Sequence, residues 1–265
     1  MTLFTRRLPP GCRQCLKGCG TNLYVTGLCT RDCFFCFNNK PRKDEIVVHG
    51  IPVREPEEAA EIVGRYGLRS VGISGGEPLL FPERVLRIVR VLCRLPDRPR
   101  IDLYTNGDRI DEAILKELRE AGLDAVRFNL VARGYDRTPL ALALRVFDEV
   151  AVEVPVIPED MERLKDMVLA LDSLGVPFLN IHELFVCAEN SDRVLAKGHA
   201  ERQNDFKHLL WRPTEQSAQA ALELLLFALE NTAQLSVYYC SCQTQEMISQ
   251  RGLLHRQRWA ASAGS

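Results

Sequence analysis

The chain has 265 residues, of which 46% are hydrophobic and 26% charged, and its net charge is −1 at pH 7. This length permits a substantial core, and the near-neutral charge gives no electrostatic support for nonspecific binding to nucleic acid or an anionic membrane. No apolar run reaches the roughly 18 residues of a membrane span, and residues 1–10 lack the apolar stretch of a signal peptide. We therefore expect a cytoplasmic protein, in which ten cysteines favour metal binding or catalysis over disulfides.

Strand-like and helical segments alternate along the chain. An acidic turn after Pro56 suits a helix start, and apolar helical stripes over residues 114–121 and 164–171 end near Gly122 and Gly175. Residues 188–214 are long and polar, so we expect a functional loop or a short helix there. The expected strands are residues 22–26, 70–73, 100–104, 125–130, 150–157, 178–181 and 235–239.

This alternation predicts an α/β fold, a partial (β/α)6-type TIM barrel of parallel strands with outer helices. Such barrels carry their chemistry on loops after the carboxyl ends of the strands. Polar or glycine-rich segments follow four of the expected strands, at residues 27–36, 74–78, 105–107 and 182–183. We expect a cysteine-containing N-terminal extension over residues 1–21 and a core over 22–183. Residues 184–265 would add a loop, helices and a closing strand to the same domain.

Residues 29–36 read CTRDCFFC and place Cys29, Cys33 and Cys36 on one short loop after the first expected strand. Three thiolates that close in sequence can converge on one metal centre, and by itself this spacing fits either zinc or an iron–sulfur cluster. A [4Fe–4S] cluster held by three cysteines keeps one iron free, and an open metal position can bind and activate a ligand.

In this spacing, with Phe35 just before the last cysteine, the sequence resembles the radical S-adenosylmethionine (SAM) superfamily. The resemblance extends to the segment from Ser74 through Gly75, Gly76 and Glu77 to Pro78, which matches the family's GGEP segment. There, backbone groups and the carboxylate would hold the amino group of SAM. Further matches are the TNG segment with Asn106, Asn129 as a contact to the ribose or carboxylate of SAM, and residues 154–158 beside the adenine.

The resemblance, which covers residues 22–183, implies two cofactors, a [4Fe–4S] cluster and SAM. It also implies that one electron from the reduced cluster cleaves SAM to methionine and a 5′-deoxyadenosyl radical, with flavodoxin or ferredoxin as an electron donor. The protein would position the reactants and exclude water.

Two further groups of cysteines lie near the ends of the chain. If the sheet closes, its first and last strands become neighbours, and four thiols would meet in an auxiliary site for a second iron–sulfur cluster or zinc. The alternative is reduced thiols without a metal. Cys19 would be left over, and Cys93 and Cys187 are expected to be packing residues. The four candidate ligands are Cys12, Cys15, Cys240 and Cys242.

Three residues are candidates for the catalytic, substrate-facing end of the barrel. His182 and Glu183 follow an expected strand and would orient a substrate or move a proton, or else face solvent or a surface arginine. Arg127 would face inward to meet a carboxylate of the substrate or of SAM.

The sequence therefore predicts an enzyme that cleaves SAM and abstracts hydrogen from an unidentified substrate. The compact size and neutral charge favour a small molecule over a protein or peptide, and neither a membrane nor a nucleic acid is expected as a partner. Two alternatives stay open: an activating enzyme for a glycyl-radical protein or another protein or peptide modifier, and a non-enzymatic iron–sulfur or zinc module.

Overall fold

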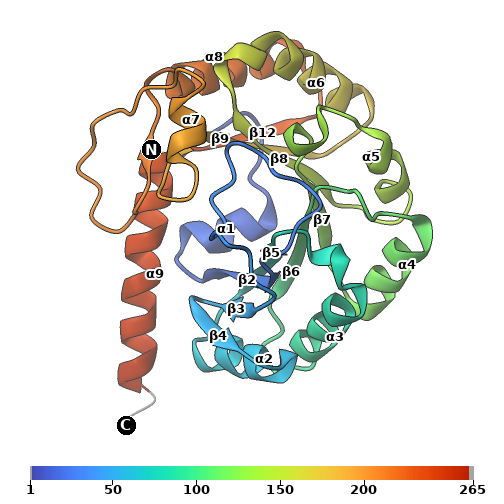
Figure 1. Ribbon diagram of the computed structural model, residues 1–265. Helices are drawn as coiled ribbons and strands as arrows, with labels where there is room; N and C mark the ends of the chain where they lie inside the picture. The colour runs from blue at the N-terminus through green and yellow to red at the C-terminus, as the bar shows by residue number, and fades with distance from the viewer. Residues whose placement is uncertain (1, 263–265) are drawn as a thin grey trace.

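The computed structural model describes residues 2–262. Within this range a ten-stranded sheet curls into an open barrel with the strand order β1-β12-β9-β8-β7-β6-β5-β2-β3-β4 (Figure 1). The parallel α/β barrel is confirmed, and the predicted closing strand, β12, is its seventh parallel strand. The parallel strands are β2 (Gly20–Thr26), β5 (Ser70–Gly75), β6 (Arg100–Thr105), β7 (Ala125–Phe128), β8 (Val150–Val156), β9 (Phe178–Glu183) and β12 (Ser236–Cys240).

Short antiparallel strands extend both edges of this sheet. One strand pairs with β12, and a hairpin pairs with β2. A separate two-stranded sheet lies beyond β9. None of these is predicted from the sequence, because two or three residues are too few to show an alternating pattern. They are β1 (Leu3–Phe4), β3 (Ile46–Val48), β4 (Ile51–Val53), β10 (Phe185–Val186) and β11 (Arg212–Pro213).

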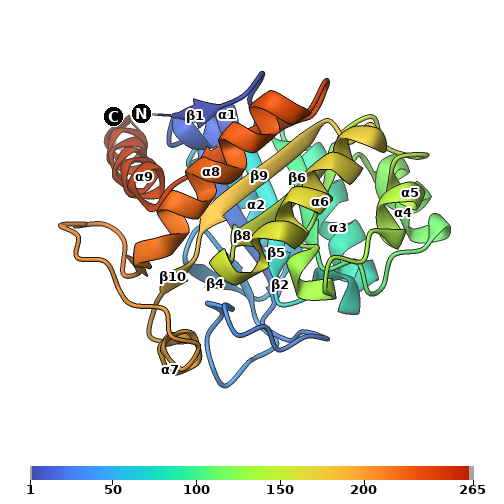
Figure 2. The same cartoon turned by 90° about the horizontal axis from the view of Figure 1, so that it is seen from above.

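Helices cover the outside of the barrel (Figures 1 and 2). They are α2 (Pro56–Arg65), α3 (Pro82–Cys93), α4 (Glu112–Ala121), α5 (Thr138–Ala143), α6 (Met161–Ser173) and α8 (Glu215–Asn231). The ends of α4 follow local chemistry: the Asp111 carboxylate accepts a hydrogen bond from the Ile114 N–H, and Gly122 ends the helix with a φ of 106°. None of the helices described for residues 2–262 has the length and apolar composition that a membrane crossing requires.

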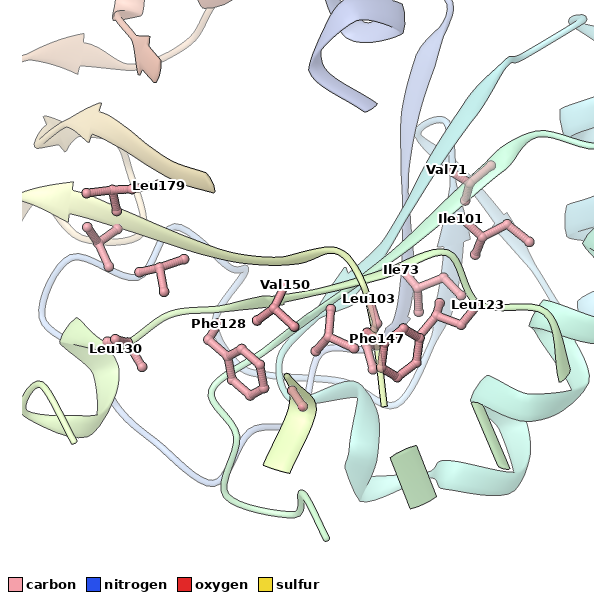
Figure 3. Close-up of a cluster of buried hydrophobic side chains, with 14 of the residues drawn as sticks. Val71, Ile73, Ile101, Leu103, Leu123, Phe128, Leu130, Phe147, Val150 and Leu179 are labelled. Carbon is pink, nitrogen blue, oxygen red and sulfur yellow. The ribbon is translucent and has the colours of Figure 1, made fainter. Parts of the chain in front are cut away.

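The two faces of the strands differ sharply in polarity. In β8, Val150, Val152 and Val154 belong to the apolar core, whereas Glu153 bonds to side chains of the barrel interior. Figure 3 shows the corresponding apolar side chains of neighbouring strands, such as Leu103 and Phe128, on the side that faces the helices. Because side chains alternate between faces, the core lies outside the strands and the lumen is polar.

The N-terminal segment enters the barrel. The helix α1 (Pro10–Leu16) lies within the curve of the sheet (Figure 1), where a Cβ at Gly11 would stand 2.6 Å from Asp102 Oδ2 of β6. Glycine is therefore required for this close approach. The expectation that the first and last parallel strands become neighbours is wrong, because β2 and β12 take β3 and β1 as partners. The C-terminal helix α9 (Cys242–Ser262) packs against α1 instead.

The two isolated cysteines lie where packing residues are expected. Cys187 is buried, as predicted. Cys93 is half-buried against the core, with its sulfur 3.7 Å from the Gly122 carbonyl oxygen. Neither requires a functional explanation.

Candidate active site at the carboxyl ends of the strands

The cysteine loop follows β2 and carries Cys29, Cys33 and Cys36. Burial raises the pKa of the Cys33 thiol to about 11, and the charges of Cys36 and Cys29 add to this rise. Burial also raises the pKa of Cys29, whose sulfur accepts a hydrogen bond from the Arg31 N–H at 3.4 Å. The three sulfurs thus lie in one another's electrostatic field.

Cys29, Cys33 and Cys36 are free thiols on one loop, and they would hold a four-iron cluster with one thiolate on each of three irons. The Asn106 side chain donates from Nδ2 to the Cys29 sulfur at 3.8 Å. Hydrogen bonds of this kind orient the ligands of a metal site.

Asp108, which the sequence analysis leaves unassigned, anchors the cysteine loop. Its carboxylate accepts two bonds of 2.7 Å from the Arg31 guanidinium and one of 2.6 Å from the Thr30 hydroxyl. Arg133, after β7, donates a further bond at 2.7 Å. These bonds hold the pKa of Asp108 below its usual value, with the Arg31 hydrogen bond as the largest cause. The loop is therefore fixed by groups other than its cysteines.

Gly75, the last residue of β5, and Gly76, which follows it, let two backbone segments pass in close contact. The Gly76 N–H donates to the Thr26 oxygen at 2.8 Å, and the Glu77 N–H donates to the Leu28 oxygen at 2.8 Å. A Cβ at Gly76 would stand 1.8 Å from the Leu28 oxygen, and one at Gly75 would stand 2.3 Å from the Thr26 oxygen. The glycine pair is thus required by contact with the start of the cysteine loop.

Gly76→Ala is expected to destabilise the protein by about 3 kcal/mol and to displace the cysteine loop, because neither backbone can yield without breaking these bonds. Thermal unfolding and iron content after anaerobic reconstitution measure the two effects. Gly64→Ala is the matched control: its Cβ meets Leu95 Cδ2 at 3.4 Å, and in α2 alanine should stabilise by about 0.5–1 kcal/mol. Equal behaviour of the two variants would contradict the steric argument.

Glu77 has different partners from those that the resemblance implies. Its fully buried carboxylate accepts bonds from the Thr105 hydroxyl at 2.7 Å, the Asn106 N–H at 2.8 Å and the Leu79 N–H at 3.1 Å. Burial raises its pKa, and these bonds oppose the rise. The carboxylate joins the loops after β5 and β6, and its contact with the amino group of SAM stays a prediction.

The remaining predicted cofactor residues lie at or just after the carboxyl ends of β5, β6 and β7. Asn106 Nδ2 donates to the Thr30 hydroxyl at 2.9 Å, within the loop itself. The side-chain oxygen of Asn129 accepts from the Ala132 N–H at 3.1 Å and so caps the turn η2 (Val131–Arg133). Ser74 is half-buried at the end of β5, and Pro78 is buried at the start of η1 (Pro78–Leu80).

A pocket of about 330 Å³ opens beside the cysteine loop. It is lined by residues 31–35 of that loop, by the turn after β7 and by Ile157, Asp160 and Arg163 after β8. Tyr135 lines it with a left-handed φ of 71°, a costly conformation for a side chain, and its hydroxyl donates to Asp160 at 2.9 Å. Phe35 and Ile157 give the pocket an apolar part.

Residues 188–214 pack against the same loop and contain α7 (Ser191–Leu195), in agreement with the expectation of a functional loop or short helix. The Asn190 side chain donates to the Phe35 carbonyl at 3.1 Å, and Lys197 lies 4.8 Å from the centre of the Phe34 ring. His199 stacks on the same ring. This segment therefore supports Phe34 and Phe35, two of the residues that line the pocket.

Arg127 faces inward as predicted, but its partners belong to the protein. The guanidinium is buried and donates to Asp102 Oδ2 at 2.7 and 2.9 Å, and it lies 3.5 Å from Glu153. Its pKa is raised well above its usual value: burial opposes the charge, but Tyr104, Asp102 and Glu153 favour it. The prediction of a catalytic contact is replaced by a structural ion pair beneath α1.

His182 and Glu183 lie on opposite faces of β9, so the predicted pair does not act together. His182 faces the lumen, where its Nε2 lies 2.7 Å from Glu153 Oε1. Glu183 faces outward, is 1% exposed and accepts bonds from the Tyr239 hydroxyl and Arg202. Two adjacent strand residues must point to opposite sides. Glu153, the partner of His182, was not predicted from the sequence. It could have been noticed as the single charged residue within an apolar strand.

Comparison with known proteins agrees with the motif. The model of the radical SAM superfamily matches residues 23–133. A putative glycyl-radical enzyme activating enzyme of Methanocaldococcus jannaschii is 29% identical over 260 residues, which cover 94% of this chain and 67% of that protein. A probable GTP 3′,8-cyclase of Methanocella arvoryzae is 33% identical over 113 residues, 43% of this chain, and the match spans only 34% of that protein.

Solved structures share the fold. The structure of Streptococcus suis SuiB bound to S-adenosylmethionine aligns with a TM-score of 0.58 at 14% identity, over 84% of this chain and 50% of that one. The AdoMet-bound structure of anSMEcpe aligns with a TM-score of 0.53 at 15% identity, over 81% and 61% of the two chains. The cysteine motif, the barrel and these relatives agree: over residues 23–133 this chain is similar to the radical SAM superfamily, and two solved structures that share its fold hold bound S-adenosylmethionine.

Proposed function

We propose that this enzyme cleaves SAM at a cluster held by Cys29, Cys33 and Cys36 and abstracts hydrogen from a small polar molecule in the barrel lumen. The observation that carries the proposal is the position of the cysteine loop, which stands over a pocket of about 330 Å³ at the carboxyl ends of the strands. When bound, the reduced cluster and SAM supply the electron transfer and the 5′-deoxyadenosyl radical. The chain supplies position and exclusion of water.

Residues around the pocket would hold SAM. Phe35 and Ile157 offer an apolar surface to the adenine, and Asn129 stands at the adjacent turn as a candidate for the ribose or carboxylate. The strand end from Ser74 to Pro78 would contribute backbone groups, and its Gly75 carbonyl already accepts a bond from the Asn38 side chain at 2.6 Å. Asn106 would orient the cluster ligand Cys29.

His182 is the candidate for contact with the substrate. Its side chain is 22% exposed in the lumen, and Glu153 fixes one ring nitrogen at 2.7 Å. Burial raises the pKa of Glu153, but His182, Arg127 and Asn180 together lower it below its usual value. An ionised Glu153 would hold the ring in place, so that His182 can bind a polar group or move a proton.

The limited space inside the barrel favours a small molecule. Within the described residues, α1 lies inside the curve of the sheet, with Gly11 beside Asp102 and Cys12 beside Asn180, so the rest of the lumen leaves no room for a folded protein.

The name of the Methanocaldococcus jannaschii relative supports the alternative of a glycyl-radical activating enzyme.

An anaerobic assay tests the proposal. The reconstituted protein is reduced with dithionite, or with flavodoxin or ferredoxin as proposed donors, and SAM is added; we expect 5′-deoxyadenosine and methionine. An intact cluster without 5′-deoxyadenosine would contradict the enzymatic proposal and favour a non-enzymatic iron–sulfur module.

The substrate class needs a second measurement. Cell extract is divided by filtration into small molecules and macromolecules, and each fraction is added to the same assay. We expect the small-molecule fraction to increase 5′-deoxyadenosine formation above the rate without substrate. Stimulation by the macromolecular fraction alone would favour the protein-modifying alternative.

A further inference from the structure

Two cysteines of α1 share one face of that helix. Cys12 and Cys15 are three residues apart, a spacing that places side chains side by side on a helix. The Cys12 sulfur lies 3.2 Å from the Asn180 side-chain nitrogen of β9 and 4.0 Å from Arg127 Nη1. This face of α1 is therefore directed into the lumen, toward the last parallel strands.

Cys240 reaches the same region from β12. It pairs with His182 of β9, and Tyr238, two residues earlier on the same face, pairs with Asn180. Because Asn180 and His182 face the lumen, Cys240 does too. Cys242 lies outside this group: its N–H donates to Glu183, and its thiol lies near Glu183 and Arg202 on the outer side of the sheet. Three of the four predicted auxiliary thiols converge, and the fourth does not.

One buried polar atom beside these thiols has no partner. Asn180 Oδ1 accepts no hydrogen bond, although Asn180 is 2% exposed. The Tyr238 hydroxyl lies beside the Cys240 thiol, and the ionisable groups that affect Tyr238 most are the thiols of Cys240, Cys12 and Cys15. Buried polar atoms are nearly always satisfied, so the free Asn180 oxygen indicates a further group beside the thiols.

Electrostatics is consistent with one shared environment. Burial raises the pKa of Cys12 to about 11 and that of Cys15 to about 12, and the charge of Cys12 raises the latter further. The pKa of Cys240 is raised well above its usual value, by burial first and by Cys15 next.

We propose that Cys12, Cys15 and Cys240 hold a second iron–sulfur cluster inside the barrel. With Cys242 on the outer side of the sheet, three of the four predicted ligands remain, one fewer than a four-ligand structural zinc site takes. Three thiols leave one iron of a four-iron cluster without a cysteine. That iron would lie in the lumen that holds His182, within the proposed substrate space.

Iron and acid-labile sulfide counts test this inference without requiring SAM cleavage. The triple variant Cys29→Ala/Cys33→Ala/Cys36→Ala is reconstituted anaerobically, and we expect it to retain about four irons and an iron–sulfur spectrum. Adding Cys12→Ala or Cys240→Ala should remove this iron. Zinc measured in the same samples should be absent.

Cys242→Ala is the matched control, since it lies two residues from Cys240 in the same segment but on the outer side of the sheet. It should leave the iron of the triple variant unchanged, as should Cys19→Ala. If the triple variant shows a native circular dichroism spectrum but contains no iron, the proposal is overturned. If the triple variant does not fold, the decisive comparison is wild type against Cys240→Ala: about four irons in both would overturn it, and a drop from about eight to four would support it.

Discussion

Cys33→Ala is expected to reduce 5′-deoxyadenosine formation to the background of the iron-free protein. Cys33 lies in the electrostatic field of both other loop cysteines, so its loss leaves two of three proposed ligands for the catalytic cluster. The fold should be retained, because Asp108 and the Gly75–Gly76 contacts hold the loop without the thiols. The measurement combines SAM cleavage, the spectrum of the cluster and thermal unfolding.

Cys93→Ala provides the control for this experiment. Cys93 is the last residue of α3, and its sulfur packs against Gly122, away from the cysteine loop. Its removal should therefore leave SAM cleavage unchanged. Full SAM cleavage by Cys33→Ala would contradict the assignment of the loop. Loss of iron in Cys33→Ala with persistence of the iron attributed to Cys12, Cys15 and Cys240 would separate the two proposed clusters.

Arg127→Leu is expected to destabilise the protein by about 3 kcal/mol, the lower end of the usual cost of breaking a buried ion pair, because Arg100 remains 2.9 Å from the other Asp102 oxygen. The Asp102 carboxylate would lose both of its bonds from Arg127, in a position that is 2% exposed. Chemical denaturation gives the change in the free energy of unfolding. We expect SAM cleavage per folded molecule to change far less than stability.

Two comparisons sharpen this prediction. Arg119→Leu removes an exposed ion pair with Asp148, which should contribute at most about 1 kcal/mol. Arg127→Met/Asp102→Leu removes both buried charges and should be more stable than Arg127→Leu alone. Wild-type stability of Arg127→Leu together with lost SAM cleavage would restore Arg127 as a catalytic residue.

Local pattern was sufficient to predict the strands of the barrel wall. The alternation of valines in β8 and the apolar runs in β5 and β6 identify strands, and polar segments after them identify the end of the barrel that carries the site. The Cys29 to Cys36 spacing is equally local, since the three thiols lie within one loop. The short strands β1, β3 and β4 escape this reasoning because they are held by pairing with distant segments.

The partners of individual side chains were much harder to predict. Glu77 matches a family motif, yet its carboxylate bonds to Thr105 and Asn106, 28 and 29 residues away. Arg127 has the predicted inward direction, but only the neighbouring strand supplies Asp102 as its carboxylate. The face to which a strand side chain points follows from the alternation of residues along the strand, whereas the residue that it contacts depends on the register between strands.

The barrel wall, the cysteine loop and the resemblance to a known family are all readable from the sequence, because each rests on patterns within a few tens of residues. Only the tertiary structure placed α1 in the lumen, separated Cys240 from Cys242 and paired His182 with Glu153. The Cys12 sulfur meets Asn180 across 168 residues of sequence. Contacts of that separation depend on how the whole sheet curls and on which edge strands it acquires, and no local periodicity encodes either.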